Sequence, residues 1–139
     1  MKKLVTFLVV VILLSGCNSE LTLSKVTPKG NNKTLQSFTT NAQDQNGVYL
    51  YLDNPKTIYI YLNESNVIQG EKATYVTDFK VEKDGNTLKI LYNTDKTSNY
   101  SKPKLNHELL YKIKLDKKYD TIRSFQNGEE VSFNAVSGK

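Results

Sequence analysis

The chain has 139 residues, with 19 basic and 14 acidic side chains, a formal net charge of +5, one cysteine and no tryptophan. This length suits a single domain, and the charge is too weak and too evenly spread to indicate a nucleic-acid-binding protein. A lone cysteine excludes an intramolecular disulfide, so an apolar core must hold the domain together.

The N-terminus combines a charged start with a short apolar segment. Lys2 and Lys3 precede the nearly continuous apolar run Leu4 to Leu14, which overlaps the sequence Leu14-Ser15-Gly16-Cys17. A membrane-spanning helix needs about 20 apolar residues, so this run is too short to be one. The pattern resembles the signal peptide and lipobox of bacterial lipoproteins, which implies cleavage before Cys17 and a diacylglyceryl group on its sulfur. We expect residues 1–16 to be removed and the mature chain to be lipid-anchored at the extracytoplasmic face of the cell membrane.

Residues 17–46 are polar, with few apolar side chains and no helical period. A short strand near Thr34 to Thr40 is the one element that this segment suggests. The remainder is typical of a flexible tether, and about 28 residues of coil would hold the domain roughly 30 Å from the membrane. Loss of the two N-terminal lysines leaves a mature net charge of about +3, which weakly favours an anionic surface.

The strongest structural signal is the segment Val48 to Leu62, where apolar residues alternate with tyrosines around the turn sequence Asp53-Asn54-Pro55-Lys56. Alternation with a period of two indicates β-strands. A hairpin here places Leu50 opposite Ile60, and the predicted register pairs Val48 with Leu62, Leu52 with Ile58, Tyr49 with Tyr61, and Tyr51 with Tyr59. A one-residue slip would mix the two faces of the hairpin, so the pattern favours this register.

Four tyrosines therefore share one face of this hairpin: Tyr49, Tyr51, Tyr59 and Tyr61. Tyrosine rings stack on sugars and peptides while their hydroxyls stay hydrated, which makes the face a candidate binding surface. The alternative is that tyrosine simply suits a half-buried sheet. Glycan-binding platforms usually include tryptophan, which this chain lacks, and that favours the alternative.

A second hairpin is predicted between Tyr75 and Tyr92. With Asp84 and Gly85 at its corner, Val81 faces Leu88 and Phe79 faces Ile90. The polar stretch Asn93 to Asn106 then forms a connection long enough to suggest a functional or disordered loop. Its exposed aromatic and basic residues are candidates for contact with a protein or an anionic glycan: Tyr100, Lys102 and Lys104.

The C-terminal part contains a further strand, Leu109 to Leu115, and a hairpin in which Asn127-Gly128 joins Ile122–Phe125 to Glu130–Phe133. Residues 135–139 form a small polar tail. About seven short strands without a convincing helix predict an all-β domain over residues 47–134. We expect an antiparallel β-sandwich, immunoglobulin-like in its commonest form, or a small barrel.

The sequence contains no pattern that names a reaction. The sole histidine, His107, has no second nitrogen or sulfur ligand with which to form a metal site, and no nucleophile motif accompanies it. We expect His107 to end a loop and meet solvent. We therefore predict no catalytic residues, no metal and no cofactor, and we predict that the protein is not an enzyme.

The strand layout from Thr57 to Phe133 is similar to that of small β-rich envelope lipoproteins that assist or restrain a larger partner, such as the protease-stabilising PrcB-like proteins. This resemblance implies an envelope protein partner. The leading hypothesis is a non-catalytic protein-interaction or regulatory module on the membrane. A module that binds envelope or cell-wall glycan is the alternative, and a hydrolase that uses His107 ranks third.

Overall fold

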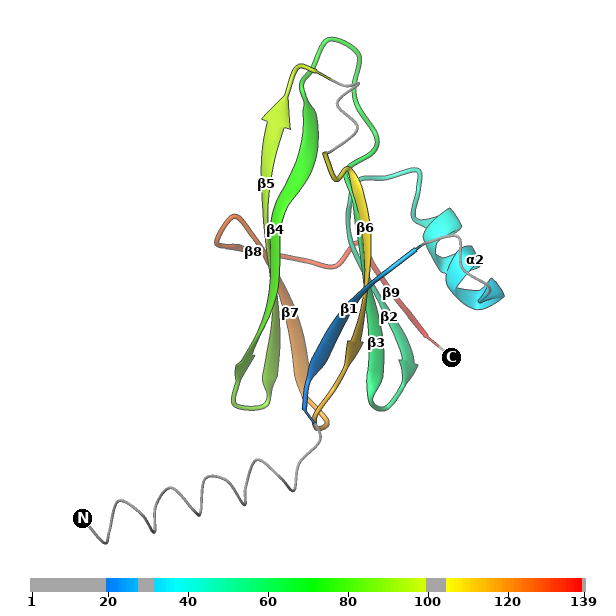
Figure 1. The fold of residues 1–139 in the computed structure, drawn as a ribbon, viewed down its shortest axis with the longest axis vertical. Helices are drawn as coiled ribbons and strands as arrows, with labels where there is room; N and C mark the ends of the chain where they lie inside the picture. Colours follow the sequence, from blue (N-terminus) through cyan, green and yellow to red (C-terminus); the bar gives the residue numbers. More distant parts are fainter. Residues whose placement is uncertain (1–19, 28–31, 100–104, 139) are drawn as a thin grey trace, which may run out of the picture.

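We describe residues 20–27, 32–99 and 105–138 in a computed structural model of the chain (Figure 1). Two β-sheets pack face to face, as the sequence predicted, and the described residues form an all-β sandwich without a closed barrel. The first sheet contains, in spatial order, β1 (Thr22–Val26), β6 (Glu108–Lys114), β3 (Thr57–Asn63), β2 (Gly47–Asn54) and β9 (Ala135–Gly138). The second contains β4 (Ala73–Asp84), β5 (Thr87–Thr97), β7 (Thr121–Gln126) and β8 (Glu129–Val131).

The core lies between the sheets and is built by the alternation in the sequence. Every second residue of β2 and β3 points inward, including Leu50 and Ile60, and these side chains meet Leu88 and Ile90 of β5. At the β1 side of the sandwich, Phe79 of the second sheet stacks on Tyr111 of the first, with ring centroids 3.9 Å apart. This apolar layer holds the two sheets together.

The first hairpin has the predicted register. Leu50 pairs with Ile60 and Tyr49 pairs with Tyr61 in the antiparallel ladder between β2 and β3, and the other three predicted pairs are also present. The ladder extends one pair further than predicted at each end, to Gly47 with Asn63 and, across an irregularity after Leu52, to Asn54 with Thr57. The pattern of apolar residues and tyrosines therefore determined this register.

The second hairpin is present, but its predicted register was wrong. Val81 pairs with Ile90 rather than Leu88, and Asp84 pairs with Thr87, so Gly85 and Asn86 form the two-residue turn. Gly85 has φ +59°, whereas Asn86 is not among the described residues with positive φ. This is the type II′ arrangement, which needs glycine at the first central position. The turn therefore lies one residue later than the Asp-Gly pair suggested.

The third predicted turn is confirmed. Asn127 and Gly128 both have positive φ, 53° and 84°, and they join β7 to β8 with Gln126 opposite Glu129. Two parallel pairings, β5 with β7 and β2 with β9, interrupt the antiparallel arrangement that the sequence suggested. Neither pairing joins strands adjacent in sequence, so no turn signal could reveal it.

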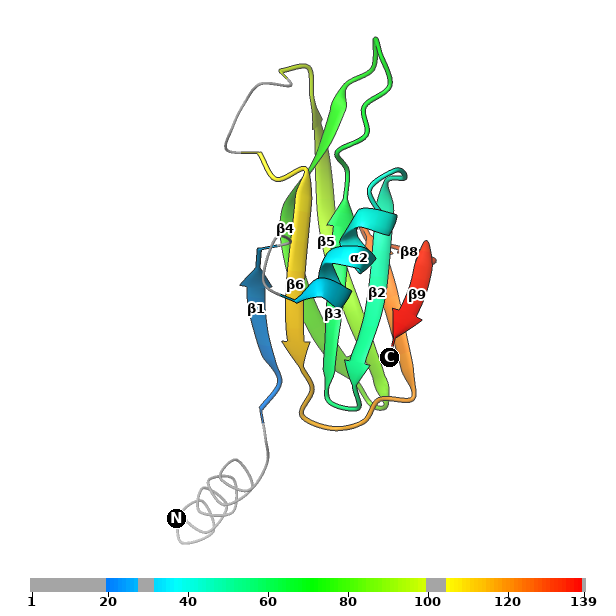
Figure 2. The ribbon, with the colours of Figure 1, turned by 90° about the vertical axis from the view of Figure 1, so that its right-hand side faces the viewer.

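The predicted tether contains two folded elements, and this part of the prediction was wrong. Strand β1 pairs along β6 from Thr22 opposite Lys114 to Val26 opposite Leu110. Where a short strand was expected near Thr34 to Thr40, the chain forms helix α2 (Lys33–Asn41), which lies on the outer face of the first sheet (Figure 2). The predicted C-terminal tail was also wrong, because β9 pairs with β2.

Helix α2 is stabilised at its start and along one side. The side chain of Asn32 accepts hydrogen bonds from the backbone N–H groups of Thr34 and Leu35, which caps the helix. Leu35, Phe38 and Ala42 lie three and four residues apart and therefore share one face, which is buried against the sheet. This short stripe is the helical period that the threonine-rich composition obscured.

Candidate functional site

The four tyrosines of the first hairpin do share one face, but this face is covered. The exposed fraction of each ring is at most 6 %. Phe38 of α2 lies over them, with its ring centroid 5.2 Å from that of Tyr51 and 6.2 Å from that of Tyr61. The interpretation of Tyr49, Tyr51, Tyr59 and Tyr61 as an exposed binding surface is therefore wrong, because α2 buries them in a second apolar cluster.

Two of these tyrosines are fixed by hydrogen bonds as well as by packing. The Tyr61 hydroxyl donates to Glu108 Oε1 at 2.6 Å, and the Tyr49 hydroxyl donates to the Gln45 carbonyl at 2.6 Å. Burial, followed by the hydrogen bond to Glu108, raises the pKa of Tyr61 far above its usual range. The rings are thus held as structural elements beneath the helix.

Tyr100, Lys102 and Lys104 lie outside the described residues, so their predicted role stays a prediction. The connection that contains them is shorter than predicted, because β5 continues to Thr97 and Asn106 already pairs with Val76 in a β-bridge. Cys17 also lies outside the described residues, and the lipobox remains a prediction. Within the described part of the chain, no helix is long and apolar enough to cross a membrane.

His107 lies at the end of the loop before β6, as expected, but it is only partly exposed to solvent. Its ring is partly buried, its Nδ1 lies 2.7 Å from the Thr74 carbonyl oxygen, and Tyr75 packs edge-on against it at 6.5 Å between centroids. Its Nε2 is buried and makes no hydrogen bond to the described residues. The contacts of this ring thus tie the end of β6 to β4.

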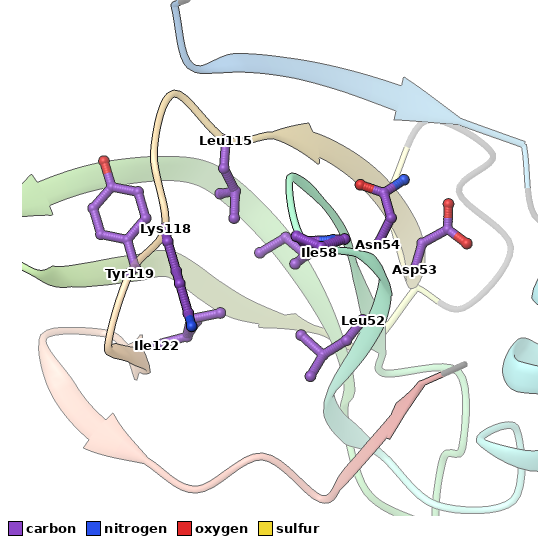
Figure 3. Close-up of a pocket in the computed structure, with 9 residues that line it drawn as sticks. Leu52, Asp53, Asn54, Ile58, Leu115, Lys118, Tyr119 and Ile122 are labelled. Atoms are coloured by element: carbon purple, nitrogen blue, oxygen red, sulfur yellow. The ribbon is translucent and has the colours of Figure 1, made fainter.

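A pocket with a volume of about 450 Å³ opens at one end of the sandwich, where the two sheets diverge (Figure 3). We call it the terminal pocket. Leu52 and Ile58 line it from the first hairpin, Ile122 lines it from β7, and Leu115 and Tyr119 line it from the segment that connects β6 to β7. Asp53, Asn54, Pro55 and Lys118 complete its wall. Its interior is apolar, and charged side chains lie at its edge.

The wall of the terminal pocket is held by polar contacts. The Tyr119 hydroxyl donates to Asp116 Oδ1 at 2.7 Å, and Lys83 Nζ lies 3.1 Å from the other oxygen of Asp116. Although desolvation opposes it, these hydrogen bonds keep the pKa of Asp116 below its usual value. Lys117 Nζ lies 5.1 Å from the Tyr119 ring centroid. Leu52, in contrast, is 41 % exposed, so apolar surface is accessible at the mouth of the pocket.

The chain enters the fold at this same end. Thr22, the first residue of β1, pairs with Lys114, which adjoins the pocket residue Leu115. The Leu115 N–H donates to the Lys56 carbonyl at 2.7 Å, which joins this region to the turn of the first hairpin. The start of β1 and the terminal pocket therefore occupy one end of the sandwich.

A second pocket, with a volume of about 330 Å³, lies between the sheets at the opposite end of β2 and β3 from the terminal pocket. We call it the Glu64 pocket. Glu64 and Tyr92 line it, together with Asn46, Gly47, Val48, Gln126, Val131, Ser132 and Asn134. Glu64 follows β3 directly and Tyr92 belongs to β5. The remaining residues come from the start of β2, the ends of β7 and β8, and the segment between β8 and β9. This wall is largely polar.

Glu64 is the chemically unusual group in this pocket. Its side chain is only 8 % exposed, and its carboxyl group takes part in none of the hydrogen bonds or ion pairs among the described residues. Burial raises the pKa of Glu64. Burial and, after it, the nearby Glu64 charge raise the pKa of Tyr92 to about 12. A buried carboxyl without a partner is uncommon in folded proteins.

Three asparagines hold the frame of the Glu64 pocket. The buried Asn63 amide donates to the carbonyls of Ala42, Gln43 and Gln45, at 3.0 to 3.2 Å. Asn134 accepts from the Val48 N–H and donates to the Asn46 carbonyl. The Asn46 side chain in turn exchanges hydrogen bonds with the backbone of Asn66. These bonds join segments up to 88 residues apart and fix the pocket.

Comparison with known proteins finds no matching family model, no matching curated protein and no matching solved structure. Neither pocket was predicted from the sequence. The available signal for the Glu64 pocket was a charged residue placed directly after β3, a strand whose residues are all buried. For the terminal pocket, it was the inward-facing Leu52 at the end of β2, next to a polar turn.

Proposed function

We propose that this protein is a lipid-anchored extracytoplasmic β-sandwich that acts as a non-catalytic protein-interaction or regulatory module. The terminal pocket is the observation that supports this function. Its apolar interior, the 41 % exposed Leu52 at its mouth and the adjacent Lys118 combine an apolar centre with a charged rim. Protein-binding sites have this composition, since buried apolar anchors supply the affinity and rim charges guide the encounter.

The position of the pocket favours a partner close to the membrane. Cys17 lies five positions before Thr22, and Thr22 begins β1 at the end of the sandwich that carries the pocket. Five residues span at most about 18 Å even when fully extended. A lipid on Cys17 would therefore hold the pocket near the membrane surface, within reach of a membrane protein or a membrane-bound partner.

Site-specific photo-crosslinking in intact cells tests this function. A photoreactive residue replaces Lys118 at the pocket rim in the full-length chain. We expect one discrete protein adduct after illumination. A second substitution, Leu52→Asp, places a charge at the mouth of the pocket and should abolish the adduct, because an apolar partner side chain would then lose its binding site.

The matched control is Ile68→Asp, which removes another exposed apolar side chain, 68 % exposed, from the loop at the opposite end of the sandwich (Figure 1). This control should leave the adduct unchanged. Replacement of Cys17 by serine should release the protein from the membrane and reduce the adduct strongly. The proposed function is contradicted if Lys118 yields no discrete adduct, or if Leu52→Asp and Ile68→Asp have the same effect.

A further inference from the structure

The Glu64 pocket presents an excess of hydrogen-bond acceptors around one acidic group. Gln126 uses its Nε2 to donate to Thr94 Oγ1 at 3.2 Å, which leaves the amide oxygen available. Ser132 and Tyr92 add hydroxyl groups to the wall. None of the residues that line this pocket is a lysine or an arginine. The wall therefore lacks a cationic group that could pair with Glu64.

A cationic ligand would satisfy Glu64 at a site the fold has already prepared. Burial has already removed part of the hydration shell of this carboxyl group in the folded chain, so a ligand that pairs with it displaces less water. Hydrogen bonds between an ammonium group and a carboxylate are about twice as strong as neutral ones. The asparagine bonds that frame the pocket keep its wall preformed, which lowers the entropic cost of binding.

We propose that the Glu64 pocket binds a small amino sugar through its free ammonium group, with Glu64 as the ion-pair partner and Gln126 and Ser132 as hydroxyl-binding residues. The volume of about 330 Å³ is at the lower end of the range for small-molecule sites and suits one sugar unit. A lysine side chain would carry the same charge, but its aliphatic stem needs an apolar channel, and this wall is mainly polar. The inference goes beyond the proposed function, because the terminal pocket contributes no residue to this site.

The test is a binding titration of the full-length chain, purified in detergent, with three ligands: glucosamine, N-acetylglucosamine and Nα-acetyl-lysinamide. Glucosamine should bind saturably. N-acetylglucosamine keeps the sugar ring but loses the charge, so its affinity should fall about tenfold or more. The lysine derivative keeps the charge but lacks the hydroxyl groups, and it should also bind more weakly than glucosamine.

Substitution then assigns the binding to the pocket. Glu64→Gln preserves the shape of the side chain and should weaken glucosamine binding about tenfold or more. Glu20→Gln removes one acidic charge from an exposed position and should leave the affinity unchanged. Circular dichroism checks that each variant is folded. If Glu64→Gln does not fold, the comparison of the three ligands on the unmodified chain still tests the inference.

Three results would overturn the inference. Absence of saturable glucosamine binding would show that the pocket does not bind an amino sugar. Equal binding of N-acetylglucosamine would show that the ammonium group does not contribute to the affinity. Equal or tighter binding of the lysine derivative replaces the sugar with a peptide amine. None of these results affects the crosslinking test of the terminal pocket, so failure of this inference is distinguishable from failure of the proposed function.

Discussion

Replacement of Phe38 by alanine tests whether α2 is held on the first sheet by its aromatic contacts. The Phe38 side chain is 8 % exposed, and its ring contacts the rings of Tyr51 and Tyr61. A buried Phe→Ala change costs about 3 to 5 kcal/mol, and each aromatic pair contributes about 0.5 to 1.5 kcal/mol of such a loss. We expect the lower part of this range, because a helix on the outer face can partly settle into the space.

The perturbation should remain local. Helix α2 has nine residues, and an isolated helix of this length is marginal in water. Its docking therefore depends on Leu35, Phe38 and Ala42, while the core between the sheets does not involve Phe38. Hydrogen exchange should accelerate in α2 while the amides of β3 and β5 remain protected.

Urea denaturation and hydrogen exchange measure the two effects, and second-derivative absorbance reports exposure of the four tyrosines. Phe38→Ala should lower the free energy of unfolding by about 3 kcal/mol and should increase tyrosine exposure. Ser37→Ala, at an exposed position of the same helix, should change it by less than about 0.5 kcal/mol. The reasoning is refuted if Phe38→Ala behaves like this control, since the tyrosine face would then be buried by something other than the helix.

Three further substitutions address the Glu64 pocket, each measured by urea denaturation. Gly47→Ala should destabilise the fold by about 2 kcal/mol or more, because Gly47 has φ +147° and an added Cβ would collide with the Asn134 side chain; an unchanged midpoint would contradict this. Asn63→Ala should cost about 2 to 3 kcal/mol, because it leaves three carbonyls without their donor, and a loss below 1 kcal/mol would count against that account. Glu64→Gln should raise stability at pH 7 and have no effect near pH 4. A raised pKa makes the folded state bind the proton more tightly, so stability falls as pH rises above the usual glutamate pKa of 4.5, and glutamine removes that fall. A stability gain independent of pH would refute this reason.

The sequence predicted elements whose signal lies within a few neighbouring residues. The register of β2 and β3 followed from alternation, because a one-residue shift would have exchanged the leucines and tyrosines between the two faces. The turn at Asn127-Gly128 followed from the preference of both residues for positive φ. At Lys83-Asp84-Gly85-Asn86 two adjacent pairs were suitable turns, and both place Val81 on the core face, so alternation could not choose between them.

Elements that depend on distant partners could not be predicted in this way. The residues of β9 are small and exposed, and their strand conformation depends on pairing with β2, more than 80 residues earlier. Three apolar side chains mark the helical period of α2, and the surface on which α2 packs is the tyrosine face itself. The tyrosines were correctly placed on one face, but the chain that covers them precedes them in sequence. The tyrosine face is therefore buried, and the two pockets are the candidate sites.

The two pockets should function independently, because they lie at opposite ends of β2 and β3. Ile58 lines the terminal pocket, and Glu64 lies six residues further along the same extended chain, which corresponds to about 20 Å. Substitutions at such a separation are usually additive. Leu52→Asp should therefore abolish the Lys118 crosslink without changing glucosamine affinity, and Glu64→Gln should weaken glucosamine binding without changing the crosslink. With the start of β1 at the terminal end, a lipid on Cys17 would direct the terminal pocket towards the membrane and the Glu64 pocket away from it. Mutual loss of both activities in either variant would show instead that the sandwich acts as one coupled site.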